Sequence, residues 1–363
     1  MTTQHTGTRP ATAGETVSEA ALTRFCAAVL ARLGVPEPDG KLVAAALVEA
    51  DLRGVESHGV VRFPIYVERI AAGAVNPRAR ISVLRESTTS AVVDGDNGLG
   101  HLVGTRAMEI AVAKGRAGFC AFVAVRNSNH FGTASHFAEM ALDAEQIGLS
   151  FTIGGINHMV PWGGAEPILG NNPFAVAIPA GAEPPVTLDM ACSVAARGKI
   201  IVAAKDGTPI PPDWAVGPDG RPTTDPVEAL KGFVQPVGGP KGYALTLTIG
   251  LLSTMLSGAF FGSEVTHLYE DLERAQNVGH LLGVIPVGLF EEPARFRARM
   301  DKAIREVRNV RRAAGVERIY LPGERERLLK AGRRRAGIPL GAAILAELDE
   351  VGARYGVALA RSA

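Results

Sequence analysis

Several residue types and patterns are scarce in this sequence, and each scarcity argues against a class of protein. Only 3 cysteines occur among 363 residues, and they form no Cys-x-x-Cys pair, so neither a disulfide framework nor a zinc site is expected. The 38 basic and 37 acidic side chains nearly cancel, and the longest basic run is Arg333–Arg335, so the charge pattern does not suit a phosphate backbone. We therefore expect no metal centre, no nucleic-acid partner and a reducing, cytoplasmic location.

Apolar segments of membrane length are also scarce. Residues 243–262 carry no charge over 20 positions, which is enough for a helix to cross a bilayer. Serines and threonines interrupt this stretch, and aromatic residues do not flank both of its ends, so we interpret it as a buried helix and expect no membrane partner. The polar residues 1–14 lack the apolar core of a secretory signal, and we expect a disordered tail over residues 1–16.

Hydrophobic residues make up 47% of the chain, which predicts a globular protein with a large core and about two domains. Helical spacing of apolar residues begins after Ser18, a suitable N-cap, resumes after Gly40, and covers residues 57–72. It returns over residues 325–355, where a Gly-Ile-Pro sequence interrupts it. Both ends of the chain are therefore predicted to be helical.

The middle of the chain has a different pattern. Short apolar runs bounded by glycine, asparagine or proline predict strands, and stretches with helical spacing lie between them. This alternation predicts an α/β domain over residues 79–319, beside a helical domain formed by residues 17–78 and 320–363. Glycine and proline concentrate in residues 207–240, which predicts a long surface loop. The predicted strands are residues 90–94, 118–125, 148–153, 174–178 and 283–289, and the predicted helices are residues 101–114, 134–144 and 293–310.

The glycine-rich phosphate turn of a Rossmann domain, Gly-x-Gly-x-x-Gly, is absent from the sequence. The nearest candidate runs from Gly95 to Gly100 with the spacing Gly-x-x-Gly-x-Gly, and it lacks a clear acidic partner for a ribose, so a structural turn is the favoured interpretation. The Gly-x-Ser-x-Gly elbow of many serine hydrolases is absent as well. Any nucleotide must therefore be held by other means.

The densest polar cluster runs from Arg53 to Tyr66. If a helix begins at Ser57, His58 and Arg62 lie four positions apart on one face, where they pair a proton donor with a guanidinium group that can grip a carboxylate in two places. A 2-oxo acid reductase needs such a pair. The alternative is a helix capped by Ser57, with two ordinary surface side chains after it.

Further places in the chain could carry chemistry. His130 follows a predicted strand at its carboxyl end, where ligands often bind, yet it could equally hydrogen-bond a loop carbonyl. Asp189 interrupts an apolar stretch before Ser193, so it could orient a histidine or cap the following helix. Lys241 and Arg325 lie beside glycines, where backbone N–H groups could also bind phosphate.

Taken together and in order, these segments resemble the family of type-2 malate and L-lactate dehydrogenases, which includes ureidoglycolate and sulfolactate dehydrogenases, diketogulonate reductase and piperideine-2-carboxylate reductase. The resemblance extends from about Ser18 to Tyr355. One such motif would be weak evidence, but six in the same order are specific. The six segments are Ser57-His58-Gly59 with Arg62, Asn127 to Gly132, Gly170 to Pro173, Thr187 to Met190, Gly238 to Gly242, and Pro322 to Arg325.

The resemblance implies how a nucleotide is bound without a Rossmann turn. Members of the family use NAD(P)H in a non-Rossmann α/β domain with a mixed sheet, combine it with a helical domain, and form homodimers. The choice between NADH and NADPH stays open because the usual acidic ribose partner has no counterpart in this sequence. The positions that match the family's nucleotide contacts are His130, Thr187, Leu188, Asp189, Ser193, Lys241, Gly242, Gly323, Glu324 and Arg325.

The resemblance also implies a catalytic set. His58 would be the proton donor, with Ser57 and Asp189 as its relay partners. Where family members commonly have Gly-Thr-Asn-Pro, this chain has a second amide in place of the threonine hydroxyl, which changes the polar contact at that position. The positions implied for a small carboxylate-bearing substrate are Arg62, Asn171 and His130.

The predicted reaction is hydride transfer between nicotinamide and a small 2-oxo acid, with His58 protonating the product, and the reverse reaction oxidises a 2-hydroxy acid. A histidine suits both directions because its unperturbed pKa is about 6.5. A cyclic imine reductase of the same family would use the same site on another substrate. A hydrolase or a non-enzymatic binding protein is a further alternative.

Overall fold

The computed structural model describes residues 15–361, and their contacts divide the chain into two compact units. Unit 1 contains the residues up to Glu68 and those from Arg325 onward, and unit 2 contains Arg69–Glu324. Residues 69–78 and 320–324, assigned to the helical domain from the sequence, thus belong to unit 2. The predicted tail over residues 1–14 lies outside the described residues.

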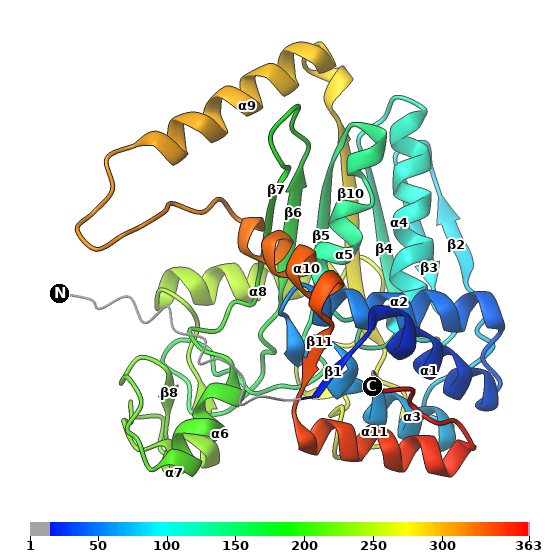
Figure 1. Ribbon diagram of the computed structural model, residues 1–363, viewed down its shortest axis with the longest axis vertical. Helices are drawn as coiled ribbons and strands as arrows, with labels where there is room; N and C mark the ends of the chain where they lie inside the picture. Colours follow the sequence, from blue (N-terminus) through cyan, green and yellow to red (C-terminus); the bar gives the residue numbers. More distant parts are fainter. Residues whose placement is uncertain (1–14, 362–363) are drawn as a thin grey trace. The chain divides into compact units, whose positions relative to one another are not determined.

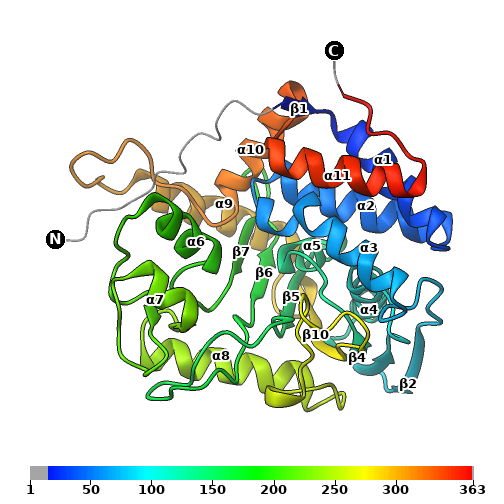
Figure 2. The ribbon, with the colours of Figure 1, turned by 90° about the horizontal axis from the view of Figure 1, so that it is seen from below.

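Unit 1 is mainly helical, as the spacing of its apolar residues predicts. Ser18 is confirmed as an N-cap, since its side chain accepts a hydrogen bond from the N–H of Ala21 at 3.2 Å. The first helix packs against the second and against the last helix of the chain through buried residues such as Phe25 and Leu348 (Figure 2). The helices are α1 (Glu19–Arg32), α2 (Glu37–Leu52), the start of α3 (Phe63–Ala71), α10 (Glu324–Ala336) and α11 (Ala342–Tyr355).

A short antiparallel sheet in unit 1 corrects the predicted extent of the tail. Residues 15 and 16 belong to β1 (Glu15–Val17), which pairs with β11 (Ile338–Leu340). Val17 and Ile338 face each other in this ladder and are both fully buried. The Gly-Ile-Pro sequence that was expected to interrupt the C-terminal helix therefore does so by forming a strand. Pairing between the two ends of the chain is invisible to local spacing.

Unit 2 contains a mixed sheet of seven strands in the order β2-β3-β4-β10-β5-β6-β7 (Figure 1). Only β3 and β4 pair in parallel, and the other neighbours are antiparallel. The predicted α/β class with a mixed sheet is confirmed. The strands are β2 (Ser82–Glu86), β3 (Ser90–Asp94), β4 (Ala121–Ser128), β5 (Gln146–Thr152), β6 (Phe174–Ile178), β7 (Val186–Met190) and β10 (Val278–Pro286).

Helices cover both faces of this sheet. Two of them, α4 (Gly100–Arg116) and α5 (Ala134–Glu139), pack on one face over a core that includes Val123, Phe137 and Leu282. The helix α8 (Pro240–Thr254) packs on the other face (Figure 2). It lies so close to β10 that a side chain at Gly279 would meet the Ser253 carbonyl oxygen at 2.3 Å. β10 is thereby buried on both sides, which explains why its sequence is apolar apart from the buried His280.

The last charged helix of unit 2, α9 (Pro293–Asn309), has nearly the predicted bounds and lies over the connection between β6 and β7 (Figure 1). The predicted helix over residues 134–144 is shorter, since α5 ends at Glu139 and a separate 3-10 turn covers Leu142–Ala144. The predicted strand over residues 283–289 begins earlier and ends at Pro286.

Residues 207–240 form more structure than the expected surface loop. They contain α7 (Pro226–Lys231) and a small ladder of β8 (Ala215–Val216) with β9 (Phe233–Val234). Together with α6 (Arg197–Asp206), this region buries its own apolar cluster around Met159 and Ile200. Its many glycines and prolines therefore form the turns of a packed region.

The charge-free stretch over residues 243–262 is divided between α8 and the turns that follow it. Gly258 has a φ of +78°, and a further 3-10 turn begins at Gly262. Within residues 15–361, no helix is both long enough and apolar enough to cross a membrane.

Candidate active site

The segment that carries Ser57, His58 and Arg62 is not the continuous helix that the sequence predicts. It consists of two 3-10 turns, Glu56–His58 and Val60–Arg62, with Gly59 between them. The Oδ2 atom of Asp51 accepts the Val60 N–H at 2.8 Å, the group that a continuing α-helix would bond to the carbonyl four residues earlier. A side chain on Gly59 would approach the Asp51 carboxylate to 2.0 Å, so only glycine fits at this position.

The turns nevertheless bring three of the predicted side chains of unit 1 together. The Ser57 Oγ atom is hydrogen-bonded to His58 Nδ1 at 2.9 Å. The Arg62 Nε–H donates to the Ser57 carbonyl oxygen at 2.6 Å. His58 and Arg62 are both half-buried. A histidine, its hydroxyl partner and a guanidinium group thus share one short segment of backbone.

The surroundings of His58 favour its neutral form. Burial, followed by the positive charge of Arg62, lowers the pKa of His58 to about 4. At neutral pH the imidazole is therefore uncharged and able to accept a proton. A negatively charged substrate group bound at Arg62 would oppose that positive charge and raise the pKa of His58 again.

In unit 2, Asp189 lies on the edge strand β7 and caps a helix. Its Oδ2 atom accepts the N–H of Ser135, in the first turn of α5, at 2.9 Å. One of the two roles considered for this aspartate was a cap on the helix that follows it, but the helix it caps precedes it in the chain. A tertiary contact between residues 54 positions apart makes this cap.

The neighbouring Thr187 connects β7 to another segment that the sequence singles out. Its N–H donates to the Pro322 carbonyl oxygen at 3.1 Å, and its hydroxyl donates to Glu139 at 2.8 Å. The strand that carries Thr187, Leu188 and Asp189 is thereby joined to the turn before Glu324. Two of the predicted nucleotide-binding segments are thus adjacent in unit 2.

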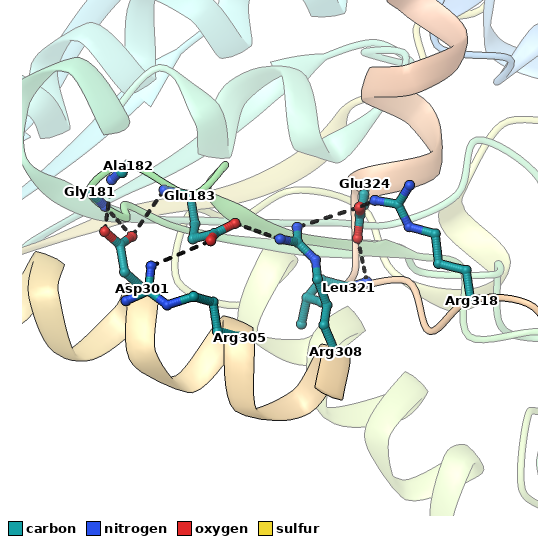
Figure 3. A network of polar contacts seen from close by, with 9 residues as sticks. All are labelled: Gly181, Ala182, Glu183, Asp301, Arg305, Arg308, Arg318, Leu321 and Glu324. Carbon is teal, nitrogen blue, oxygen red and sulfur yellow. Dashed lines mark hydrogen bonds and ion pairs between the residues drawn. The ribbon is translucent and has the colours of Figure 1, made fainter. Parts of the chain in front are cut away.

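The carboxylate of Glu324 is buried and occupied by donors of the protein itself (Figure 3). Its Oε2 atom accepts the N–H of Leu321 at 3.1 Å, and its Oε1 atom pairs with Arg308 at 3.4 Å and with Arg318. Desolvation would raise the pKa of Glu324, but the Leu321 N–H and the two guanidinium groups together hold it below its usual value. Glu324 therefore fastens the turn at residues 321–324, where Gly323 has a φ of +80°.

This network continues along α9 (Figure 3). Arg308 also pairs with Glu183 at 2.5 Å, and Arg305 reaches the same carboxylate at 3.5 Å. Asp301, one turn earlier on α9, accepts three backbone N–H groups from residues 181–183. The network thus ties both the connection before β7 and the turn beside β7 to one helix. Sequence analysis missed Asp301 and Arg308, whose only signal was a charged helix.

Backbone hydrogen bonds gather a second set of predicted residues in unit 2. The carbonyl oxygen of Asn171 accepts the N–H of Cys192 at 2.7 Å, and the carbonyl oxygen of Cys192 accepts the N–H of Val237 at 2.8 Å. Ser193 pairs with Pro236 in an isolated bridge. The segment that ends at Ser193 therefore runs beside both the Asn171 loop and the approach to α8.

The first turn of α8 carries Lys241 and Gly242. Lys241 is exposed, and a side chain at Gly242 would approach the Val237 carbonyl oxygen to 1.5 Å. The N-terminus of α8 has no side-chain cap among the described residues. An uncapped helix start beside a lysine suits an anionic group such as a phosphate.

The glycine-rich segment from Gly95 to Gly100 lies beside the loop that carries His130. The carbonyl oxygens of Asn129 and His130 would be 2.1 Å and 2.4 Å from a side chain at Gly100, and the Asn127 carbonyl oxygen would be 2.6 Å from one at Gly95. The Gly95 to Gly100 segment thus packs on the loop after β4, which fits a structural turn. His130 is half-buried in that loop.

The candidate residues are divided between the units. The histidine, serine and guanidinium group of the turn belong to unit 1, together with Arg325, and the others belong to unit 2. Within the described part of the chain, no group of three or more histidine, cysteine or carboxylate side chains is arranged to hold a metal ion.

Comparison with known proteins identifies relatives along nearly the whole chain. The family model for malate/L-lactate dehydrogenase matches residues 17–349. A malate dehydrogenase of Pyrococcus abyssi is 41% identical over 341 residues, which cover 92% of this chain and 93% of that protein. Further relatives have names that specify NAD(+) or NADP(+).

Solved structures agree with these matches. The structure of sulfolactate dehydrogenase from Methanocaldococcus jannaschii has a TM-score of 0.90 and 38% identity, covering 95% of this chain and 98% of that chain. A Δ1-piperideine-2-carboxylate reductase from Pseudomonas syringae has a TM-score of 0.81 and 29% identity, covering 93% of this chain and 99% of that chain.

Proposed function

Because the chain belongs to the malate/L-lactate dehydrogenase family, we propose that it transfers hydride between nicotinamide and a small 2-hydroxy acid through the segment that carries His58 and Arg62. The chain is an NAD(P)-dependent oxidoreductase that acts on 2-hydroxy acids. The observation that carries the assignment of the site is the contact set of Ser57, His58 and Arg62 within one pair of turns.

In this proposal His58 exchanges a proton with the substrate. During oxidation of a 2-hydroxy acid, the neutral imidazole accepts the hydroxyl proton while the hydrogen on the same carbon leaves as hydride. During reduction, the protonated ring returns that proton to the carbonyl oxygen. Ser57 orients the ring through its Oγ contact with Nδ1. The match of Thr187 to Met190 with the family's motif supports Asp189 as the second relay partner.

Arg62 binds the substrate carboxylate in this proposal. Its Nε–H is directed to the Ser57 carbonyl oxygen, which fixes the guanidinium group beside the segment that holds His58. An arginine can grip a carboxylate with two parallel hydrogen bonds. Asn171 and His130 complete the proposed substrate contacts.

NADH or NADPH would supply or accept the hydride, and the residues of unit 2 fit such a group. The uncapped start of α8 beside Lys241 and Gly242 suits a phosphate, and the Thr187 to Asp189 strand is hydrogen-bonded to the turn before Gly323. We assign these residues, with Ser193 and Arg325, to nucleotide binding in a non-Rossmann α/β domain. Glu324 acts by holding its turn rather than by touching the nucleotide.

The first experiment follows nicotinamide absorbance with NADH and NADPH in parallel against a panel of 2-oxo acids. Malate-type and sulfolactate-type substrates come first because the relatives named above act on them. Turnover with any member supports the proposal and settles the nucleotide preference. Absence of turnover with both nucleotides across the panel would overturn it.

A cyclic imine reductase is the second candidate, supported by the likeness to the piperideine-2-carboxylate reductase structure. It would use the same proton donor on a ring nitrogen instead of a carbonyl oxygen. Cyclic 2-imino acids in the same panel separate the two candidates. A hydrolase using Ser57 and His58 would instead show no nicotinamide turnover.

We also propose that the protein is a homodimer that associates through α8. The helix and the turn after it expose apolar side chains on one side. Light scattering should give the mass of a dimer, and Leu252→Asp should shift it to a monomer, whereas Leu328→Asp on α10 should not. A monomeric wild-type protein would contradict the proposal. The exposed apolar residues are Leu245, Leu251, Leu252, Met255 and Leu256.

The scattered cysteines support a cytoplasmic location. Cys26 and Cys192 are buried thiols, and among the described residues no cysteine forms a disulfide. Fractionation of the source cells with a specific antibody would test this assignment, and recovery outside the cytoplasm would contradict it.

A further inference from the structure

Asp51 is a buried carboxyl group that neither the proposed reaction nor the sequence motifs use. It lies in the last turn of α2, and its side chain is 1% exposed. Its Oδ2 atom accepts the Val60 N–H at 2.8 Å. This hydrogen bond joins the end of α2 to the second of the two turns, and the proposed proton donor lies in the first.

The same carboxyl group fills the space beside Gly59. A side chain on Gly59 would come within 2.0, 2.2 and 2.4 Å of three atoms of the Asp51 side chain. The φ of Gly59 is −90°, which any residue adopts, so the requirement for glycine comes from this contact and not from the backbone. Asp51 and Gly59 therefore fit against each other as one unit between His58 and Val60.

Charged and titratable groups from α10, from α1 and from the first of the two turns lie near Asp51. Arg333 of α10 donates to the Asp51 carbonyl oxygen and to the Glu56 carboxylate. Cys26 of α1 is buried, and the nearby Asp51 carboxyl helps to raise the pKa of its thiol. Burial, followed by the charge of Glu56, raises the pKa of Asp51 to about 7, against the lowering effects of Val60 and Arg333.

We propose that Asp51 is the positioning residue of the proposed reaction. By accepting the Val60 N–H and filling the space at Gly59, it breaks the helix into two turns. That break holds Ser57 Oγ against His58 and directs Arg62 to the Ser57 carbonyl oxygen. This inference rests on the proposed role of His58 and adds the residue that fixes its geometry.

The test compares Asp51→Ala with Asp51→Asn. Alanine removes the acceptor, so kcat should fall about 10- to 100-fold and the substrate KM should rise, while the Kd for the nucleotide stays unchanged. Asparagine keeps an oxygen that can accept the Val60 N–H, so it should restore most of the lost turnover. Asp143→Asn, at an exposed position of unit 2, is the control and should match the wild type.

A second pair of variants keeps the proposal testable if Asp51→Ala does not fold. Gly59→Ala should lower kcat and raise the substrate KM because the added carbon overlaps the Asp51 carboxylate. Gly332→Ala on α10, where an added carbon meets nothing within 4 Å, is its matched control. Wild-type kinetics in a folded Asp51→Ala protein, or in Gly59→Ala, would overturn the proposal.

One further readout separates failure of this inference from failure of the proposed function. If wild-type protein turns over no member of the panel, the proposed function has failed, and NMR titration of the His58 ring still tests Asp51. Loss of the Asp51 contact should open the turn, reduce the burial of His58 and move its pKa up from about 4 toward its ordinary value. An unchanged His58 titration in Asp51→Ala would sink the inference on its own.

Discussion

Asp51 in unit 1 and Asp301 in unit 2 are buried carboxyl groups that hold a neighbouring loop, but their pKa values are shifted in opposite directions. Asp51 accepts one backbone N–H, whereas Asp301 accepts three. Burial raises the pKa of Asp51 to about 7. Burial is also the largest single influence on Asp301, yet the three N–H groups and Arg305 together lower its pKa.

The comparison teaches that the donors and the neighbouring charges around a buried carboxylate together decide its charge. With one donor, desolvation dominates and the group gains a proton easily, while three donors aimed at one carboxylate stabilise the anion. The turn around Asp51 is therefore held by a carboxyl group whose pKa lies close to neutral pH. The network around Asp301 is held by a carboxylate that stays ionised at neutral pH.

The largest difference between the two sites should appear when the acceptor is deleted at Asp301 and only its charge is removed at Asp51. Asp301→Ala removes three hydrogen bonds to a carboxylate, but water can reach the N–H groups of this largely exposed turn, so the free energy of unfolding should fall by about 1.5 to 3 kcal/mol. Asp51→Asn retains an acceptor for its single donor and should cost roughly 1 kcal/mol. Urea unfolding measures both losses of unfolding free energy. Equal losses would contradict the predicted difference between the two sites.

The pH dependence of stability should also differ. Because folding raises the pKa of Asp51, the folded state binds more protons between about pH 4 and 7, so this group's contribution to stability falls as pH rises through that range. The loss should be about 4 kcal/mol and should disappear in Asp51→Asn. For Asp301 the sign is reversed, and its contribution is lost as pH falls below its ordinary pKa.

The measurement is the difference in unfolding free energy between wild type and Asp51→Asn across pH. The difference is needed because His58, His158 and His280, whose pKa values folding lowers, destabilise the protein in the same range as pH falls. A difference that does not change between pH 4 and 7 would show that Asp51 titrates normally.

A third prediction compares the proposed proton donor, His58, with a histidine outside the proposed site. His58→Ala should lower kcat about 100-fold or more because the proposed proton donor is lost. His136→Ala, at a histidine of α5 outside the proposed site, should leave kcat nearly unchanged. Steady-state kinetics measure both effects. Full activity of His58→Ala would show that another residue transfers the proton.

Glu324→Gln should act mainly on the nucleotide. A glutamine cannot pair with both Arg308 and Arg318, so the turn at Gly323 should loosen and the KM for NADH or NADPH should rise about 10-fold, with a smaller change in kcat. Glu347→Gln, at an exposed position of α11, is the control. A selective loss of kcat would contradict a positioning role.

The smallest expected effect concerns a glycine without a close neighbour. Gly332 lies in α10, and an added carbon would meet nothing within 4 Å. Gly332→Ala should stabilise the protein by up to about 1 kcal/mol because alanine loses less conformational freedom in a helix. Thermal unfolding measures this gain, and a clear destabilisation would show a hidden contact at this position.

Local patterns predicted the parts of the fold that depend on neighbours in sequence. The strands β3 and β6 have the predicted bounds, and Ser18 caps α1 as expected, because alternation and capping involve residues only a few positions apart. The order of the motifs also led to the correct family. The helix predicted over residues 57–72 is confirmed over α3 (Phe63–Ala71), but it is wrong over residues 57–62, where the Asp51 carboxylate accepts the Val60 N–H.

The sequence by itself determined the α/β class, through short-range spacing, and the family, through the order of its motifs. It also supplied the candidates proposed to move a proton or bind a carboxylate, since their side chains have the required chemistry. The tertiary structure decided which groups those residues contact. Asp189 reaches Ser135, Thr187 reaches Pro322, and Glu324 is enclosed by Arg308 and Arg318. The Thr187 and Asp189 contacts, like the one that Asp301 makes with residues 181–183, join groups far apart in the chain, so folding alone sets their geometry and charge.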